Sequence, residues 1–131
     1  MNQRSRRCVD ESRPIFLQIA EAIENDILGG ALPEESQVPS TNEFAAFYRI
    51  NPATAGKGVN LLVDEGILYK KRGIGMFVAA GAKDQVVAKR RNQFETEFVT
   101  PLVAEAAKLG ITKNQLADMI SQHINAKEGT A

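Results

Sequence analysis

The fold of this chain is decided by residues 39–79, which read PSTNEFAAFYRINPATAGKGVNLLVDEGILYKKRGIGMFVA. Ser40 stands three residues before Glu43, the spacing of a capping box, in which two side chains satisfy backbone N–H groups at the start of a helix. A second helix is predicted to begin at Asn51, a favoured N-cap, because Pro52 follows at the first helical position, where no N–H is needed. Two short helices separated by a tight turn form a helix-turn-helix pattern.

Apolar residues recur at helical spacing in both helices and predict the faces that turn toward the core. They are Phe44, Ala45, Phe47 and Tyr48 in the first helix, and Ala55, Val59, Leu62 and Val63 in the second. Arg49 and Ile50 occupy the turn between the helices, and Gly66 ends the second one, as glycine commonly does.

A basic, glycine-tipped hairpin follows the second helix. Residues 67–69 and 76–78 have the composition of two short strands, and the glycines at both ends of 73–75 permit the backbone angles of a turn. Three cations occupy residues 70–72, and no acid lies between the end of the helix and residue 78. Such a hairpin can lay positive charge and backbone N–H groups against phosphates.

In this order, the motifs resemble those of the GntR family of bacterial winged-helix repressors. The matching motifs are Pro14 to Ile19, Pro39-Ser40, Asn51-Pro52-x-Thr54, Asp64 to Leu68 and Arg72 to Val78. The short segment beyond the hairpin resembles the YtrA-type subgroup, which carries two helices in place of a large effector domain. The resemblance implies a mainly α winged helix-turn-helix domain with a small β-hairpin wing. It also implies a cytoplasmic, sequence-specific DNA-binding regulator, a dimeric repressor of a pseudo-palindromic operator near its own transporter operon.

The chain departs from the family pattern at several positions. Asn42 stands where the family often has arginine, and Glu35 where it usually has a loop glycine. In the second helix, Gly56-Lys57 replaces a frequent serine-arginine pair, and Gly58 replaces alanine. These changes leave the expected fold alone, but an operator sequence cannot be carried over from relatives.

The candidate DNA-binding residues gather at the two helix starts, the turn and the hairpin. They are Ser40, Thr41, Asn42, Arg49, Asn51, Ala53, Thr54, Gly56, Lys57, Lys71, Arg72, Gly73 and Gly75. Lys57 lies opposite the apolar stripe and therefore faces solvent, and Thr54 stands where recognition helices meet base edges. For Ser40 and Asn51, capping alone is the other interpretation. Arg49 would either reach a phosphate or stabilise a helix end.

The two helical glycines require a reason, because each costs about 1 kcal/mol relative to alanine. Gly58 borders the buried stripe, so close helix packing is the expected reason. Gly56 lies nearer the exposed side, where it would let the backbone approach DNA.

Composition is consistent with one compact domain and an appendage. The 131 residues carry 16 Lys and Arg against 16 Asp and Glu, so DNA binding must depend on where the charges lie, and affinity for arbitrary DNA should be modest. The single cysteine, Cys8, excludes an intramolecular disulfide and suits a reducing cytoplasm. No apolar run has the length of a signal peptide core or a membrane span.

Three segments are expected: a flexible tail at 1–12, the winged helix-turn-helix domain at 13–80 and a helical dimerisation region at 81–131. The domain would include a supporting helix over residues 14–28. A hinge is expected at Gly81-Ala82.

The region after the hairpin predicts two helices with exposed apolar faces. The first would run from about residue 84 to 109, with Lys89, Arg90 and Arg91 on its solvated face. Pro101 would either kink it or begin a new helix capped by Thr100. Thr112 and Gln115 form a second capping box for the last helix. A second copy of the chain would cover the apolar residues, which are Val87, Phe94, Phe98, Leu102, Leu116, Met119 and Ile120.

Catalysis and cofactors are not expected. His123 is the only histidine, and no metal ligands stand at useful spacing. A winged helix that binds protein instead of DNA is the alternative, and the placement of Lys57 and of residues 70–72 favours DNA. An effector, where one acts, is expected to be an apolar molecule bound among Phe94, Phe98 and Leu102.

Overall fold

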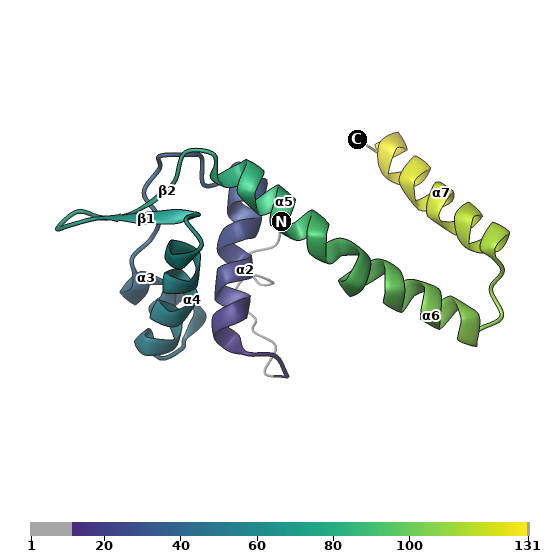
Figure 1. The fold of residues 1–131 in the computed structure, drawn as a ribbon, viewed down its shortest axis with the longest axis horizontal. Coiled ribbons are helices and arrows are strands. Elements are labelled where there is room, and N and C mark those ends of the chain that lie inside the picture. Colours follow the sequence, from purple (N-terminus) through teal and green to yellow (C-terminus); the bar gives the residue numbers. More distant parts are fainter. Residues whose placement is uncertain (1–11, 131) are drawn as a thin grey trace. The chain divides into compact units, whose positions relative to one another are not determined.

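The structure, a computed structural model, describes residues 12–130 (Figure 1). The tail expected at 1–12, including Cys8, lies almost wholly outside the described residues. The chain forms two compact units that divide between Lys89 and Arg90.

The first unit is a three-helix core with a hairpin and the beginning of a fourth helix. Its elements are α2 (Ile15–Leu28), α3 (Thr41–Tyr48), α4 (Pro52–Asp64), β1 (Leu68–Lys71), β2 (Gly75–Val78) and the first part of α5 (Ala82–Phe94). Helix α4 packs against both α2 and α3. The core contains most of the residues that the helical spacing predicted, among them Ala55, Val59 and Leu62, each fully buried. Phe47 was also expected to face the core, but it is 38% exposed.

The hairpin is antiparallel, with Leu68 opposite Val78 and Lys71 opposite Gly75. Lys70 and Lys71 therefore belong to strand β1, whereas the composition ended the strand at Tyr69. Cross-strand contact explains the longer strand: the Lys71 ammonium lies 4.5 Å from the centre of the Phe77 ring on β2. Such a contact depends on the partner strand and has no signal in the local composition.

The first unit extends beyond the boundary expected at residue 80. Ala82 and Val86 of α5 are fully buried in its core. The prediction that Lys89 lies on a solvated helix face is wrong, because its ammonium pairs with Glu24 at 2.6 Å and Glu65 at 2.8 Å. Both partners lie outside α5, so the pattern of α5 alone could not indicate them.

The second unit consists of the end of α5, the π-helical segment η1 (Glu95–Val99), α6 (Thr100–Lys108) and α7 (Lys113–Thr130). Thr100 does not cap a new helix, since Val99 and Thr100 both keep helical angles and no side chain caps α6. Instead, the Thr100 N–H donates to the carbonyl of Glu95. A proline inside a helix lacks an N–H and crowds the carbonyl four residues earlier, and the wider π turn before Pro101 accommodates it.

The second capping box is confirmed. Thr112 donates its N–H to Gln115 Oε1 at 2.9 Å, and Gln115 donates its N–H to Thr112 Oγ1 at 3.1 Å.

The predicted apolar faces are largely exposed in the single chain. Between the start of α5 and the end of α7, the large apolar residues that are 36–64% exposed are Val87, Phe94, Phe98, Leu102, Val103, Leu109, Met119, Ile120 and Ile124. Leu116 is half-buried. Large exposed apolar patches are rare on soluble monomers.

Candidate nucleic-acid interface

The start of α3 has the predicted capping box. The Ser40 hydroxyl accepts the Glu43 N–H at 3.1 Å, and Glu43 Oε1 accepts the Ser40 N–H at 2.9 Å. The hydrogen bonds from the Ser40 backbone and then its side chain hold the pKa of the Glu43 carboxyl below its ordinary value. Thr41 is half-buried beside the cap, and Asn42 is exposed.

Arg49 holds the turn between α3 and α4 in a left-handed conformation. It is the C-cap of α3, with φ 58° and ψ 51°, and its N–H donates to Ala45. Non-glycine residues rarely adopt these angles, because the Cβ crowds the following carbonyl. The side chain is exposed. Backbone geometry therefore gives Arg49 a structural role, and its charge is available to a ligand at the surface.

The first turn of α4 presents polar groups and backbone donors to solvent. Asn51 Oδ1 accepts the Ala53 N–H at 2.7 Å, so the predicted cap is formed. Asn51 and Ala53 are exposed and Thr54 is half-buried. No acid occurs in α4 before Asp64, its last residue. The positive end of the helix dipole, without a nearby carboxylate, favours an anion at this position.

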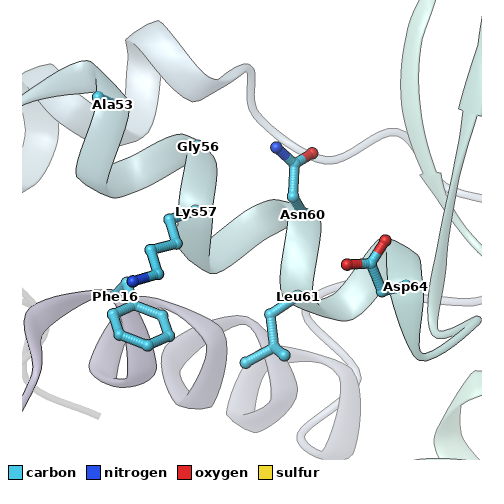
Figure 2. Close-up of a pocket in the computed structure, with 7 residues that line it drawn as sticks. All are labelled: Phe16, Ala53, Gly56, Lys57, Asn60, Leu61 and Asp64. Atoms are coloured by element: carbon cyan, nitrogen blue, oxygen red, sulfur yellow. The ribbon is translucent and has the colours of Figure 1, made fainter.

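Lys57 lies on the exposed side of α4 and leans toward α2. Its ammonium is 4.1 Å from the centre of the Phe16 ring, and Figure 2 shows the side chain extending from α4 toward that ring. The two helices border an open groove of about 550 Å³, lined by Phe16, Ala53, Gly56, Lys57, Asn60, Leu61 and Asp64. A cation–π contact at an exposed site contributes only about 0.5–1 kcal/mol, so Lys57 can leave the ring for a phosphate or a base.

Asn60 is a polar residue of α4 that was not among the candidate DNA-binding residues. It is exposed, three residues after Lys57, and its amide points away from α2 (Figure 2). Its helical spacing from Lys57 was the available signal, since residues three apart lie on one face.

The two helical glycines differ in their surroundings. A Cβ on Gly58 would lie 2.6 Å from the Phe16 carbonyl oxygen and 3.0 Å from Ile19 Cβ, so the predicted close packing of α4 on α2 is present. A Cβ on Gly56 would lie 3.5 Å from Thr41 Cγ2, an ordinary contact. Gly56 thus lies beside Thr41, and these two candidates from different helices are neighbours.

The wing carries its cations in β1 and at the tip. Lys71 and Arg72 are exposed, and Gly73 has φ 77° at the turn. The tip is braced by Gln37, whose amide nitrogen donates to the Ile74 carbonyl at 3.1 Å. A Cβ on Gly75 would lie 2.6 Å from that amide nitrogen. Gln37 is 37 residues from Ile74 in sequence, so no local pattern indicated this brace.

The described residues offer little support for metal binding or for a membrane-spanning segment. Residues 12–130 contain no group of three or more His, Cys, Asp or Glu placed to hold a metal ion. No helix in this part of the chain has the length and apolarity to cross a membrane. His123 is exposed, with Nδ1 3.0 Å from the Met119 carbonyl oxygen of its own helix.

A capped helix, a tight turn, a second helix with an acid-free exposed start and a basic hairpin together define a winged-helix DNA-binding domain. Residues 16–78 match the family described as bacterial regulatory proteins, gntR family. A solved chain from Bacteroides thetaiotaomicron, assigned to GntR-family transcriptional regulators, is 36% identical, with a TM-score of 0.70. The match covers 86% of this chain and 98% of that one. The chain therefore belongs to the GntR family.

Two further relatives bear on function. The transcriptional repressor YtrA of Bacillus subtilis is 28% identical over 85% of each chain. The DNA-binding domain of AraR, solved in complex with operator ORX1, is 30% identical with a TM-score of 0.50, over 54% of this chain and 87% of that one. Together with the family, they identify this chain as a DNA-binding transcriptional regulator and not an enzyme. They also favour DNA over the alternative of a winged helix that binds only protein.

Proposed function

We propose that the protein is a dimeric repressor that reads a pseudo-palindromic operator with α4 and the wing. The placement of charge carries this proposal. In a chain with net charge zero, the exposed start of α4 and the whole hairpin contain no acid, while Lys57, Lys70, Lys71 and Arg72 are exposed there. Phosphate neutralisation by such cations supplies nearly all of the affinity for arbitrary DNA and a large share of the affinity for a specific site.

Two kinds of contact are proposed. On α4, Asn51, Thr54 and Lys57 would meet base edges in the major groove, because the N-terminal part of a recognition helix enters it. The start of α3, the turn after it and the wing would contact phosphates. Such contacts position the domain on the duplex but do not distinguish one base sequence from another. The phosphate contacts are assigned to Ser40, Thr41, Asn42, Arg49, Lys71, Arg72 and the backbone of Gly73 and Gly75.

Alanine substitutions separate the two kinds of contact. Thr54→Ala and Lys57→Ala are expected to weaken operator binding by about 1–3 kcal/mol and to weaken binding to unrelated duplexes less. Arg72→Ala is expected to weaken binding to every duplex and to reduce the slope of log K against log salt by about one unit. Fluorescence anisotropy with a footprinted operator and a scrambled duplex measures both effects. Equal losses on both duplexes for all three variants would refute the assignment.

The proposed dimer would cover the exposed apolar residues of α5, η1, α6 and α7. Phe94 and Phe98 have ring centroids 5.7 Å apart and are 56% and 62% exposed, so a second chain would remove a large aromatic area from water. Phe98→Asp places a charge in this face and is expected to give a monomer with a folded DNA-binding unit. Sedimentation of the wild-type chain as a monomer at micromolar concentration would contradict the dimer.

An effector, where one acts, would bind at this same face. A ligand shifts DNA affinity only when it binds DNA-competent and DNA-incompetent dimers unequally, and an apolar molecule among Phe94, Phe98 and Leu102 would touch the proposed interface. A liganded structure with the molecule in the groove beside Phe16 and Lys57 would overturn this placement. As a bacterial regulator that acts on DNA, the protein would work in the cytoplasm.

A further inference from the structure

The beginning of α5 is attached to the DNA-binding unit by polar contacts one helical turn apart. At the entrance to the helix, Gly81 donates its backbone N–H to Glu34 Oε1 at 2.5 Å. Four residues later, Gln85 Nε2 donates to the backbone carbonyl of Glu65 at 3.4 Å. Since residues four apart lie on one helix face, this face of α5 lies against the unit.

Lys89 continues the same face, and here the contact is ionic. Its ammonium donates to Glu24 Oε2 at 2.6 Å and to Glu65 Oε1 at 2.8 Å. Ala82 and Val86, also four residues apart, are fully buried beside these contacts. The apolar and polar rows together attach α5 along two turns.

The partners of Lys89 belong to the two helices that form the core of the domain. Glu24 is on α2 and is 1% exposed, whereas Glu65 is the C-cap of α4. Burial opposes the charge of Lys89, but the hydrogen bonds and charges of Glu24 and Glu65 outweigh it and raise the pKa of the ammonium. Removing one partner of a buried ion pair is destabilising, so the folded domain favours this contact.

We propose that Lys89 is a positioning residue that locks the start of α5 to α2 and to the end of the recognition helix, and thereby sets the half-site spacing that the dimer accepts. The inference rests on the proposed dimeric repressor. Lys89 is the last residue of the first unit, and the helix it anchors continues into the segment with the exposed apolar residues. Lys89 itself makes no contact with DNA in this proposal.

Spacing is a sensitive readout of such a lock. One added base pair moves a half-site by about 3.4 Å and rotates it by about a tenth of a turn. A dimer whose recognition helices are held at one separation binds the shifted site poorly. When the start of α5 is released, the domains can follow the shift, and the penalty falls because the linkage between the two binding events is more flexible.

The test uses the full-length chain and palindromic duplexes selected by the wild-type protein from a random pool, remade with the half-sites moved by one or two base pairs. A duplex with a single half-site measures the affinity of the domain alone. Lys89→Ala removes both ion pairs, and Glu65→Gln removes the more exposed one. Lys83→Ala, which removes an exposed lysine from the same helix, is the matched control. The double variant Glu24→Gln/Lys89→Ala removes the buried charge at position 24 together with the ammonium and replaces the single variant if that one does not fold.

Wild type and Lys83→Ala are expected to prefer the selected spacing by about tenfold over a one-base-pair shift. Lys89→Ala, or its double variant, should reduce this preference to about threefold or less, with single half-site affinity kept within about twofold. An unchanged spacing profile overturns the inference, as does an equal loss on every duplex including the single half-site. Failure of the wild type to select any duplex would instead refute the proposed repressor.

Discussion

Alanine at the two glycines of α4 is expected to change stability in opposite directions, although the substitution and the helix are the same. Both substitutions gain about 0.5–1 kcal/mol of helix propensity. At Gly56 the new Cβ makes an ordinary 3.5 Å contact with Thr41 Cγ2, so the gain is kept. We therefore expect Gly56→Ala to raise the free energy of unfolding by about 0.5–1 kcal/mol.

At Gly58 the gain is outweighed. The Cβ would lie 2.6 Å from the Phe16 carbonyl oxygen and 3.0 Å from Ile19 Cβ, and the first of these is backbone that no rotamer change can move. Helices α2 and α4 must separate, and overpacking of this kind costs about 1–3 kcal/mol, occasionally more. Gly58→Ala should therefore lower the free energy of unfolding by about 1–2 kcal/mol after the propensity gain is subtracted.

Urea unfolding followed by circular dichroism measures the free energy of unfolding of both variants. All samples are kept at one protein concentration, because the stability of a dimer depends on concentration. The free energies of unfolding of the two variants should differ by about 1.5–3 kcal/mol, which in thermal unfolding would separate their Tm values by about 6–12 °C. Equal effects of the same sign would refute the packing argument. The operator affinity of Gly56→Ala then tests the backbone role: a more stable protein that binds DNA less well indicates close approach at this residue.

Two further outcomes follow from particular contacts. Arg49→Gly should raise the free energy of unfolding by about 1 kcal/mol, because glycine adopts the left-handed angles freely, while operator affinity falls through loss of a cation. A loss of stability, or unchanged affinity in anisotropy, would contradict one half of this prediction. The hydrogen bond to Glu35 and burial raise the pKa of Tyr69, and the pKa of Lys89 is also raised. Native protein thus holds both protons more tightly than unfolded protein, and this stabilisation is present below about pH 10 and lost as pH rises through the folded-state pKa values. Urea unfolding at pH 8 and at about pH 10.5 should show the loss, and Tyr69→Phe should reduce it; an identical loss in that variant would exclude Tyr69 as a contributor.

The structure gives a physical reason for Glu35, one of the positions at which the chain departs from the family pattern. The sequence has glutamate where the family usually has glycine, and the structure places it at φ 69°, in the region that favours glycine. The Tyr69 hydroxyl donates to its carboxylate at 2.6 Å. The side chain therefore makes a contact that glycine lacks, between positions 34 residues apart.

The sequence by itself determined the helices, their caps and the hairpin, because these depend on residues within one or two turns of each other. The capping boxes at Ser40 and Thr112 and the Asn51 cap formed as predicted, and the predicted α4 stripe is buried except for the half-buried Val63. Pro101 was also a local signal, but it allowed a kink or a new helix. The choice of a π turn depended on how the preceding backbone accommodated the ring.

Only the tertiary structure decided the partners of residues far apart in the chain. From the sequence, Lys89 is predicted to be a surface lysine. In the folded domain, α2 and the end of α4 place Glu24 and Glu65 against it. Gln37 likewise reads as loop until the hairpin folds beside it. The physical reason is that a cap is specified by neighbours along the chain, whereas an ion pair or a brace across 24 to 65 residues exists only after the core has packed.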